Sequence, residues 1–336
     1  MSTSMEQSTM KYVAIHQFGE PQVLRVSRTQ VPTPDAGQIR VKVRYAGLNF
    51  ADIMQRRGLY PGMMGMPFTP GMEVVGTVDA VGRGVTGIAV GDRVVSRLHS
   101  GGYAEYAIAD AQQAVLVPDT LGDREAAALG GTSALTAWAL HEQLGEPDGR
   151  PVFISAAAGA LGSILVPLCV ARGWTVLAGV SSAEKANLVV SLGASHAIRY
   201  DQEGWQTELL ARAGEPGLAY VFDSVGGDIY RGAHAALGSF GQLIFFGAAS
   251  GDLVGLPPEQ VFPAVIHCHT IRGFGLPGHL AQDPLAFERA THGLFTAHSE
   301  GVLSDLRTHV YPLADVAVAH ESVEQRRSSG KILFEV

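Results

Sequence analysis

The sequence is poor in cysteine, with 2 Cys among its 336 residues. Two cysteines cannot build a disulfide framework, so we expect a protein of a reducing compartment and place it in the cytoplasm. An excess of basic charge is also lacking, because 24 Lys and Arg stand against 32 Asp and Glu and give a net charge of −8. This balance excludes a nucleic-acid binder that relies on net charge. With 46% apolar and 17% charged residues, the composition also excludes a disordered chain.

Long apolar runs are scarce as well. The first ten residues are polar and lack the apolar centre of a signal peptide. The segment Val152–Ala171 is uncharged and has the length of a membrane helix. It contains Gly159, Gly162 and Pro167, however, and we interpret it as a strand, a glycine turn and a buried helix. We therefore expect no membrane partner.

Glycine, in contrast, is abundant: 41 residues, about 12% of the chain, against an average near 7%. Only glycine enters positive φ freely, so this excess indicates many tight turns or close backbone approaches. At roughly 100–200 residues per domain, the length of 336 residues indicates two domains, each with a substantial core.

Between residues 11 and 117 the chain consists of short β-rich runs separated by Gly and Pro. Val41–Tyr45 alternates apolar and polar residues, as a half-buried strand does, and Gly residues flank the expected strands Glu73–Val81 and Val90–Val95. This spacing predicts a compact barrel-like β domain. Around Asp123 the sequence changes to Ala-rich helical segments, which mark the first domain boundary.

From Pro151 onward, strand and helix patterns alternate. The expected strands are Val152–Ala156, Trp174–Val180, His196–Tyr200, Ala219–Asp223 and Gln242–Phe246. The expected helices between them are Ala160–Arg172, Ala183–Leu192, Gln206–Ala213 and Ile229–Leu237. Such alternation predicts an α/β fold with a doubly wound parallel sheet, a Rossmann domain. Past Gly247 the regularity fades, and only the strands Thr270–Phe274 and Lys331–Glu335 are predicted.

The first strand-to-helix turn of this domain reads Ala157-x-Gly159-x-x-Gly162. Gly159 would let the backbone approach a pyrophosphate, and Gly162 would let the helix lie close to the sheet. The N–H groups at the helix start, around Ala160 and Leu161, would bind the anion. The turn therefore predicts a dinucleotide site. A tight turn without a ligand is the alternative, since Ala replaces the first glycine of the GxGxxG pattern.

The end of the second strand decides which dinucleotide is expected. An NAD site places Asp or Glu there, roughly 20 residues after the turn, to bind the ribose 2′-hydroxyl. Here the strand ends in Val180-Ser181-Ser182 without a carboxylate, and Lys185 follows in the next helix. Hydroxyls and an ammonium suit a 2′-phosphate, so we expect NADPH. Ser181 and Glu184 also have the spacing of a helix capping box, and the two roles are compatible.

Several sequence blocks resemble the medium-chain dehydrogenase/reductase superfamily, in its zinc-independent branch of quinone oxidoreductases and enoyl reductases. The blocks cover nearly the whole chain: Ala46–Asp52, Arg57–Pro61, Pro70–Gly76, Gly91–Val94, Gly101–Tyr106, the AxGxxG turn, Asp223–Gly227 and Ser329–Lys331. The resemblance implies a homodimer whose chains each have a β-rich GroES-like catalytic domain, completed by the C-terminal segment, with the nucleotide domain inserted. We expect the GroES-like domain at 1–125, the Rossmann NADPH-binding domain at 126–265 and the returning segment at 266–336.

Zinc-bearing members of the superfamily have Cys where Asn49 stands and His where Met72 stands. Neither residue is a good zinc ligand, and two Cys cannot form a four-cysteine structural site, so we expect no metal. His267, Cys268 and His269 are adjacent in sequence, unlike the spaced ligands of structural zinc sites. By resemblance we expect them to lead into the edge strand that pairs across the dimer. A zinc alcohol dehydrogenase with relocated ligands is the alternative.

The resemblance also implies which residues bind the cofactor. Ala157, Gly159 and Gly162 match the pyrophosphate turn, and Ser181, Lys185 and Tyr200 match positions that hold the 2′-phosphate, with Ser182 beside them. Thr136 matches a residue near the nicotinamide, and the loops around it match at Val225, Phe246, Gly247 and Phe274. Lys331 matches a C-terminal lysine that reaches the phosphates. Tyr200 could equally be an ordinary aromatic at a strand end.

Without a metal, hydrogen-bond donors must polarise the substrate carbonyl, and a proton must follow the hydride. Tyr60 stands where similar enoyl thioester reductases carry a functional tyrosine, and Asn49 would add an amide donor at the lost zinc position. Asp52 would orient the loop. The alternative for Tyr60 is a packing aromatic in the turn Tyr60-Pro61-Gly62.

These residues predict an NADPH-dependent, zinc-independent reductase with a small-molecule substrate. Hydride would pass to a quinone or to the C=C bond of an α,β-unsaturated carbonyl, because both acceptors need a conjugated carbonyl whose oxygen is held by donors. Two alternatives are an NADPH-binding protein with little catalytic activity and an enoyl thioester reductase of a fatty-acid or polyketide type of pathway.

Overall fold

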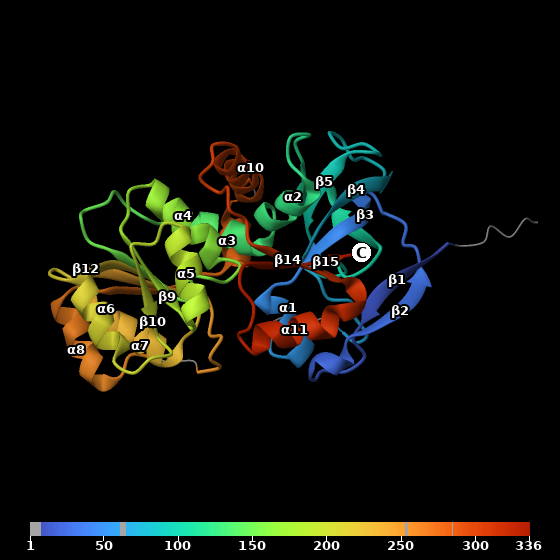
Figure 1. The fold of residues 1–336 in the computed structure, drawn as a ribbon. Helices are drawn as coiled ribbons and strands as arrows, with labels where there is room; N and C mark the ends of the chain where they lie inside the picture. The colour runs from blue at the N-terminus through green and yellow to red at the C-terminus, as the bar shows by residue number, and fades with distance from the viewer. Residues whose placement is uncertain (1–7, 61–64, 253–254, 284) are drawn as a thin grey trace, which may run out of the picture. The chain divides into compact units, whose positions relative to one another are not determined.

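The computed structural model describes residues 8–60, 65–252, 255–283 and 285–336. The chain divides into two compact units, whose elements are labelled in Figure 1. The first unit comprises Met1–Ser133 with Thr308–Val336, and the second comprises Ala134–Arg307. Of the segment 266–336, which was expected to complete both the sheet edge and the catalytic domain, residues 266–307 belong to the second unit and residues 308–336 to the first.

The first unit is built on a β sheet that both ends of the chain share. Across the sheet the strands are β14 (Thr308–Pro312), β15 (Lys331–Glu335), β3 (Gln38–Gly47), β4 (Glu73–Val81), β5 (Arg93–Arg97) and β7 (Ala114–Leu116), and β6 (Tyr106–Asp110) also pairs with β3. β15 runs antiparallel to β3, with Leu333 opposite Gly47. The C-terminal residues therefore complete the sheet that the N-terminal residues begin. β1 (Thr9–Ala14) and β2 (Arg25–Gln30) form a separate antiparallel pair.

Alternating side chains of β3 build the core of the first unit. Val41 and Val43 are buried while Lys42 between them is exposed, as in a strand with one face in the core. The two valines share one hydrophobic cluster with Phe334 of β15 and Ala319 of the last helix. The helices of this unit are α1 (Phe50–Arg57), α2 (Asp123–Leu129) and α11 (Val316–Glu324).

The second unit is a parallel sheet of six strands. Their order is β10 (His196–Arg199), β9 (Val176–Val180), β8 (Val152–Ile154), β11 (Leu218–Asp223), β12 (Leu237–Phe245) and β13 (Thr270–Gly273), and every neighbouring pair is parallel. The chain proceeds from β8 outward to β9 and β10 and then returns to β11, so the order reverses between β8 and β11. Doubly wound sheets bind their ligands at such a reversal. The predicted fold class is confirmed.

Helices cover both faces of this sheet (Figure 1). The helices of this unit are α3 (Thr132–His141), which begins at the unit boundary, α4 (Gly162–Ala171), α5 (Ala183–Ser191), α6 (Trp205–Ala213), α7 (Gly227–Ala235), α8 (Pro258–Ile266), α9 (Leu276–Gln282) and α10 (Ala286–Ser299). Trp205 and Leu209 of α6 and Tyr230 of α7 share one core with Val221 and Leu243 of the sheet. α4 and α5 contact β9, which is buried at every position, as expected for a strand covered on both sides.

Candidate functional site

The predicted cofactor residues of the second unit follow the carboxyl ends of its strands. Tyr200 follows β10, Ser181 follows β9, the Ala157–Gly162 turn follows β8, Val225 follows β11, Phe246 and Gly247 follow β12, and Phe274 follows β13. Because the strands are parallel, these ends meet at one edge of the sheet and bring distant residues into one row. The glycine turn lies at the reversal of strand order. The predicted 2′-phosphate residues lie on one side of it and the predicted nicotinamide residues on the other.

The turn between β8 and α4 combines a strained backbone with a close approach. Ala156 has a φ of 48°, a value that residues other than glycine rarely adopt, and such strain is common at ligand sites. A Cβ on Gly162 would lie 2.5 Å from the Cα and carbonyl oxygen of Ala157, so only glycine lets α4 begin this close to the strand. α4 also starts without a side-chain cap, although the N–H of Ser163 donates to the carbonyl of Gly159 at 2.9 Å, so the N–H groups before Ser163 are those suited to an anion.

The β9 end differs in one detail from the sequence expectation. Ser182, and not Ser181, caps α5, because the Ser182 Oγ accepts the backbone N–H of Lys185 at 3.3 Å. The expected capping box of Ser181 and Glu184 is therefore wrong. The Ser181 Oγ instead accepts from the Lys185 Nζ at 3.4 Å, so a hydroxyl and an ammonium lie together directly after β9. The backbone N–H of Tyr200 donates to the carbonyl of Val180 at 3.1 Å, which brings this half-buried tyrosine to the same strand end.

On the other side of the turn, buried Asp223 ties two strand ends together. Its Oδ1 accepts from the Ser155 Oγ at 2.6 Å, and its carboxylate also accepts the N–H groups of Val225 at 3.1 Å and Gly226 at 2.9 Å. Burial raises the pKa of Asp223 against the effect of these hydrogen bonds. The sequence reasoning did not single out Asp223 or Ser155. The sequence does contain a signal, an Asp at the end of a buried strand, three residues before a Gly-Gly pair.

The loops after β11, β12 and β13 are held against one another by backbone hydrogen bonds. The N–H of Phe246 donates to the carbonyl of Asp223, and the N–H of Phe274 donates to that of Phe245, both at 2.9 Å. A Cβ on Gly247 would lie 2.9 Å from the carbonyl oxygen of Ser224, so the loop depends on a glycine there. Thr136, the remaining residue predicted near the nicotinamide, lies half-buried in α3.

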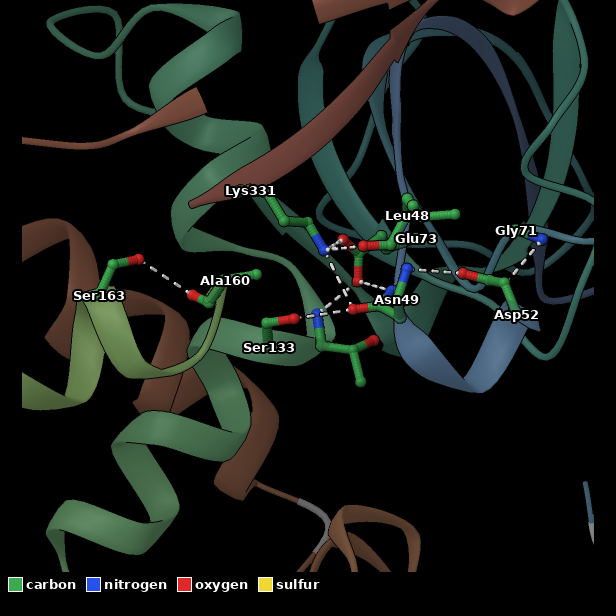
Figure 2. A network of polar contacts seen from close by, with 10 residues as sticks. Leu48, Asn49, Asp52, Gly71, Glu73, Ser133, Ala160, Ser163 and Lys331 are labelled. Atoms are coloured by element: carbon green, nitrogen blue, oxygen red, sulfur yellow. Dashed lines mark hydrogen bonds and ion pairs between the residues drawn. The ribbon is translucent and has the colours of Figure 1, made fainter. Parts of the chain in front are cut away.

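In the first unit, Asn49 belongs to a buried polar network that the sequence reasoning did not foresee (Figure 2). Asn49 stands between β3 and α1, and its Nδ2 donates to the Glu73 Oε2 at 2.8 Å. Its Oδ1 accepts from the Lys331 Nζ at 3.0 Å and from the Ser133 Oγ at 2.9 Å. The Lys331 Nζ lies 2.5 Å from the Glu73 Oε1 and forms an ion pair with it. Burial opposes ionisation of Glu73, but Lys331 and its hydrogen-bond donors hold its pKa below the ordinary value.

The resemblance implied that Lys331 reaches the cofactor phosphates, and the structure gives its ammonium contacts within the first unit. A lysine that reaches the cofactor phosphates would extend its ammonium toward an anion outside the core. Here the side chain is buried, with 3% of the residue exposed, and its Nζ contacts the carbonyl oxygen of Leu48 at 3.1 Å as well as Asn49 and Glu73. In this structure the ammonium thus contacts three oxygens of the first unit.

Asp52 closes the start of α1 next to this network. Its Oδ2 accepts the N–H of Asn49 at 2.8 Å and its Oδ1 accepts the N–H of Gly71 at 3.1 Å, so it fixes two loops, as the sequence predicted for its orienting role. Burial raises the pKa of Asp52 to about 7, and the charge of Glu73 adds to the effect. The Asn49 and Gly71 donors and Lys331 act in the opposite direction.

Tyr60, the predicted catalytic tyrosine, follows α1 and is half-buried. It lies near Arg97 of β5. Burial lowers the pKa of Arg97, and the interaction with Tyr60 raises it. The Arg97 Nη1 donates to the Gln113 Oε1 at 3.2 Å, while its buried Nε has no partner among the described residues. Pro61 and Gly62, the rest of the turn considered as an alternative, lie outside the described residues.

The histidines before β13 contact polar side chains of the second unit. The His269 Nδ1 lies 3.3 Å from the His234 Nε2, and the His267 Nδ1 lies 3.1 Å from the Ser239 Oγ, while Cys268 is exposed. Across the described parts of the chain, no three His, Cys, Asp or Glu side chains gather as ligands of a metal ion. The described helices include none that is long and apolar enough to span a membrane.

Comparison with known proteins agrees with this architecture. The family profile of the alcohol dehydrogenase GroES-like domain matches residues 35–119, and that of the zinc-binding dehydrogenases matches residues 160–287. The chain is 30% identical over 298 residues to quinone oxidoreductase-like protein 2 of Bos taurus, covering 88% of this chain and 84% of that protein. It is 30% identical over 326 residues to a 2-haloacrylate reductase of a Burkholderia species, covering 95% and 97%.

A solved structure shows the same fold over the full length. The quinone oxidoreductase of Escherichia coli, complexed with NADPH, superposes with a TM-score of 0.90 at 28% identity and covers 98% of this chain and 100% of its own. The matched profiles, the relatives and this structure agree with the two units described above. The chain belongs to the medium-chain dehydrogenase/reductase superfamily, in its quinone oxidoreductase-like branch.

Proposed function

We propose that this protein is an NADPH-dependent oxidoreductase that reduces a quinone or the C=C bond of an α,β-unsaturated carbonyl. The observation that carries the proposal is the set of residues that follow the carboxyl ends of the strands in the second unit. There the glycine turn is followed, after β9, by the paired Ser181 hydroxyl and Lys185 ammonium in place of a carboxylate. A hydroxyl and a cation favour a ribose 2′-phosphate, and a carboxylate would repel it. The NADPH complex of the Escherichia coli relative supports the same choice of cofactor.

The residues present fit this cofactor. The turn Ala157–Gly162 would hold the pyrophosphate at the uncapped start of α4. Ser181, Ser182, Lys185 and Tyr200 would hold the 2′-phosphate end. Thr136 and the loops at Val225, Phe246, Gly247 and Phe274 would surround the nicotinamide. Bound NADPH supplies a hydride from C4 of its nicotinamide ring.

The first unit would supply the groups that act on the acceptor oxygen. As electron density moves onto the carbonyl oxygen, a hydrogen-bond donor directed at that oxygen lowers the barrier. Asn49 has a carboxamide N–H for this purpose, and Tyr60 has a phenol that can donate a hydrogen bond or a proton. Glu73 and Asp52 are themselves hydrogen-bonded within the unit, so they hold Asn49 and do not react.

The choice between acceptors is open to a direct experiment. NADPH oxidation should be followed with an ortho-quinone, a 2-alkenal and a crotonyl thioester, each tested also with NADH. We expect turnover of the quinone or the alkenal and a preference for NADPH. Faster turnover of the thioester would favour the enoyl thioester reductase alternative. If NADPH binds in a fluorescence titration but none of the three acceptors is reduced, the protein is a nucleotide-binding protein and the reductase proposal fails.

We also propose that the protein is a homodimer through the β13 edge of the second unit. β13 is the last strand in the sheet order, so one side of its backbone is available for pairing. The neighbouring α8 has no buried residue, and four apolar side chains on it are exposed: Val261, Phe262, Val265 and Ile266. An apolar surface of this kind favours association. Light scattering should give a dimer mass for the wild type and a monomer mass for Phe262→Glu; a monomeric wild type would disprove the proposal.

A further inference from the structure

Asn49 is surrounded by two buried residues of opposite charge. Glu73 and Lys331 are each 3% exposed, and the pair joins the first residue of β4 to the first residue of β15. Taking two charges out of water is costly, and a buried ion pair is seldom more stabilising than well-packed apolar residues. The pair therefore calls for an explanation other than stability. Its direct contacts supply one, because both charged groups also bind the Asn49 carboxamide.

These contacts determine which end of the carboxamide lies where. The Oδ1 receives two donors, the Lys331 ammonium and the Ser133 hydroxyl, so both of its acceptor sites are used. The Nδ2 gives one hydrogen to the Glu73 Oε2. Its second hydrogen has no acceptor among the described residues, which leaves one N–H to donate to a ligand.

An isolated asparagine would not keep this orientation. The terminal torsion of the side chain is broad and roughly two-fold, so the amide can rotate and present its oxygen in place of its nitrogen. Here rotation would turn the NH₂ group toward the Lys331 ammonium and the oxygen toward the Glu73 carboxylate. Both contacts would then be repulsive, so the ion pair selects one of the two orientations.

The carboxylate that anchors the amide is itself tightly enclosed. A Cβ on Gly47 would lie 1.9 Å from the Glu73 Oε1, and a Cβ on Gly131 would lie 2.4 Å from the same atom. The Glu73 Oε2 also accepts the backbone N–H of Thr132 at 2.5 Å. The carboxylate thus fits between two glycines and has little freedom to move with the amide.

We propose that Glu73 and Lys331 are positioning residues. They hold the Asn49 carboxamide so that one N–H donates a hydrogen bond to the carbonyl oxygen of the substrate. The inference rests on the proposed function for the identity of that oxygen, but not for the orientation of the amide. It also gives Lys331 a role different from phosphate binding. The two roles predict different defects when the lysine is removed.

The first experiment compares Lys331→Met with the wild type at saturating NADPH and acceptor. A positioning role predicts a kcat lowered about 10- to 100-fold, in the range seen when a donor to a developing oxyanion is lost, with a Kd for NADPH within about 3-fold. A phosphate-binding role predicts the reverse, a weakened Kd and an unchanged kcat. The charge-neutral double variant Glu73→Gln/Lys331→Met replaces the single variant if the unpaired carboxylate prevents folding.

A double-mutant cycle separates positioning from general damage. In an Asn49→Ala background, Lys331→Met should lower kcat by less than about 2-fold, because the residue through which it acts is absent. If Lys331→Met causes its full loss in both backgrounds, Lys331 acts independently of Asn49 and the inference is overturned.

A further readout does not depend on turnover. The side-chain amide signals of Asn49, assigned by their absence in Asn49→Asp, should exchange with solvent at least about 10-fold faster in Lys331→Met than in the wild type, because a held amide exchanges slowly. Equal exchange in the two proteins would show that the lysine does not hold the amide. If no acceptor is reduced but the amide signals respond as expected, the proposed function fails and the positioning of Asn49 stands.

Discussion

The ring of Tyr103 stands edge-on to the ring of His320, with 6.0 Å between the ring centres. Both side chains are fully buried in the first unit, and the ring nitrogens of His320 have no hydrogen-bond partner among the described residues. Burial and the charge of Asp52 raise the pKa of Tyr103, so the carboxyl of Asp52 also belongs to this region. The first unit therefore encloses an acid, Asp52, and a base, His320, that both lose their hydration on folding. Their effects on stability have opposite signs.

Asp52 should destabilise the first unit as the pH rises. Burial raises its pKa to about 7 in the folded protein, against an ordinary value of 3.8, so the folded state retains a proton that the unfolded state releases. The contribution of Asp52 to the free energy of unfolding is fully present below about pH 4. It is lost as the pH rises through 7, by an amount on the order of 4 kcal/mol. Asp52→Asn removes the titration. Its stability should therefore increase more with pH, between pH 4 and 7, than that of the wild type.

The measurement must report on the first unit alone. All three tryptophans, Trp138, Trp174 and Trp205, belong to the second unit, so Trp fluorescence is unsuitable. Hydrogen exchange of peptides from β3 and β4 follows the correct unit. Asp119→Asn, the same change at an exposed position, is the control. A curve for Asp52→Asn parallel to that of the wild type would mean that Asp52 is ionised throughout this range.

His320 should act in the other direction. Burial, with a contribution from Arg56, lowers its pKa from 6.5 to about 3. The contribution of His320 to the free energy of unfolding is fully present above about pH 6.5. It is lost as the pH falls toward 3, by an amount on the order of 5 kcal/mol. His320→Phe keeps the ring contacts with Tyr103 and Phe334 but cannot be protonated. The same peptides should show less loss of protection in acid, whereas His292→Phe, at an exposed position, should follow the wild type.

Gly162→Ala should destabilise the second unit, because its Cβ would lie 2.5 Å from the backbone of Ala157 and force α4 away from the strand. Overpacking of this kind costs about 1–3 kcal/mol, which the fluorescence of Trp174 and Trp205 in a urea titration can detect. Gly159→Ala is the matched control, because its Cβ would lie 3.2 Å from the carbonyl oxygen of Ala156 and needs a small adjustment. Equal stability of the two variants would contradict the packing role of Gly162.

Lys185→Met should reduce the preference for NADPH over NADH. The ammonium lies beside the Ser181 hydroxyl after β9, where it would face a 2′-phosphate that only NADPH carries. Loss of one charge-assisted contact is expected to raise the KM for NADPH about 10-fold and to leave that for NADH unchanged. Steady-state assays with both cofactors measure the ratio, with the exposed Lys42→Met as control. An equal rise for both cofactors would point to a general defect.

The sequence allowed the prediction of elements with a strong local pattern. Glu73–Val81 and Lys331–Glu335 are strands with the predicted bounds. The strand expected at Val90–Val95 is instead Arg93–Arg97, because Gly91, with a φ of 98°, belongs to the preceding turn. The 14-residue helix α10 was not predicted. It contains Thr, His and Gly residues of low helix propensity, and its buried side chains, among them Phe287 and Leu294, stabilise it through packing.

The same contrast applies to the site. The AxGxxG turn is local, so its strand and helix context were evident from the pattern. The network around Asn49 is not local in sequence, since Lys331 is 282 residues away from Asn49 and Glu73 is 24 residues away. Glu73 reads in the sequence as the first residue of a strand, and nothing in its neighbours indicates that it is buried against a lysine. The pairing of β3 with both β4 and β15 brings the three residues together.

Tyr60 can be tested by removing one atom. Tyr60→Phe keeps the ring that would pack in a turn but loses the hydroxyl, so it separates the catalytic hypothesis from the packing alternative. Loss of a proton donor or of a donor to the carbonyl oxygen is expected to lower kcat about 100-fold at saturating acceptor, with little change in the Kd for NADPH. Tyr45→Phe, a half-buried tyrosine of β3, is the matched control and should retain activity. Full activity of Tyr60→Phe would assign the tyrosine to packing and leave Asn49 as the donor in the first unit.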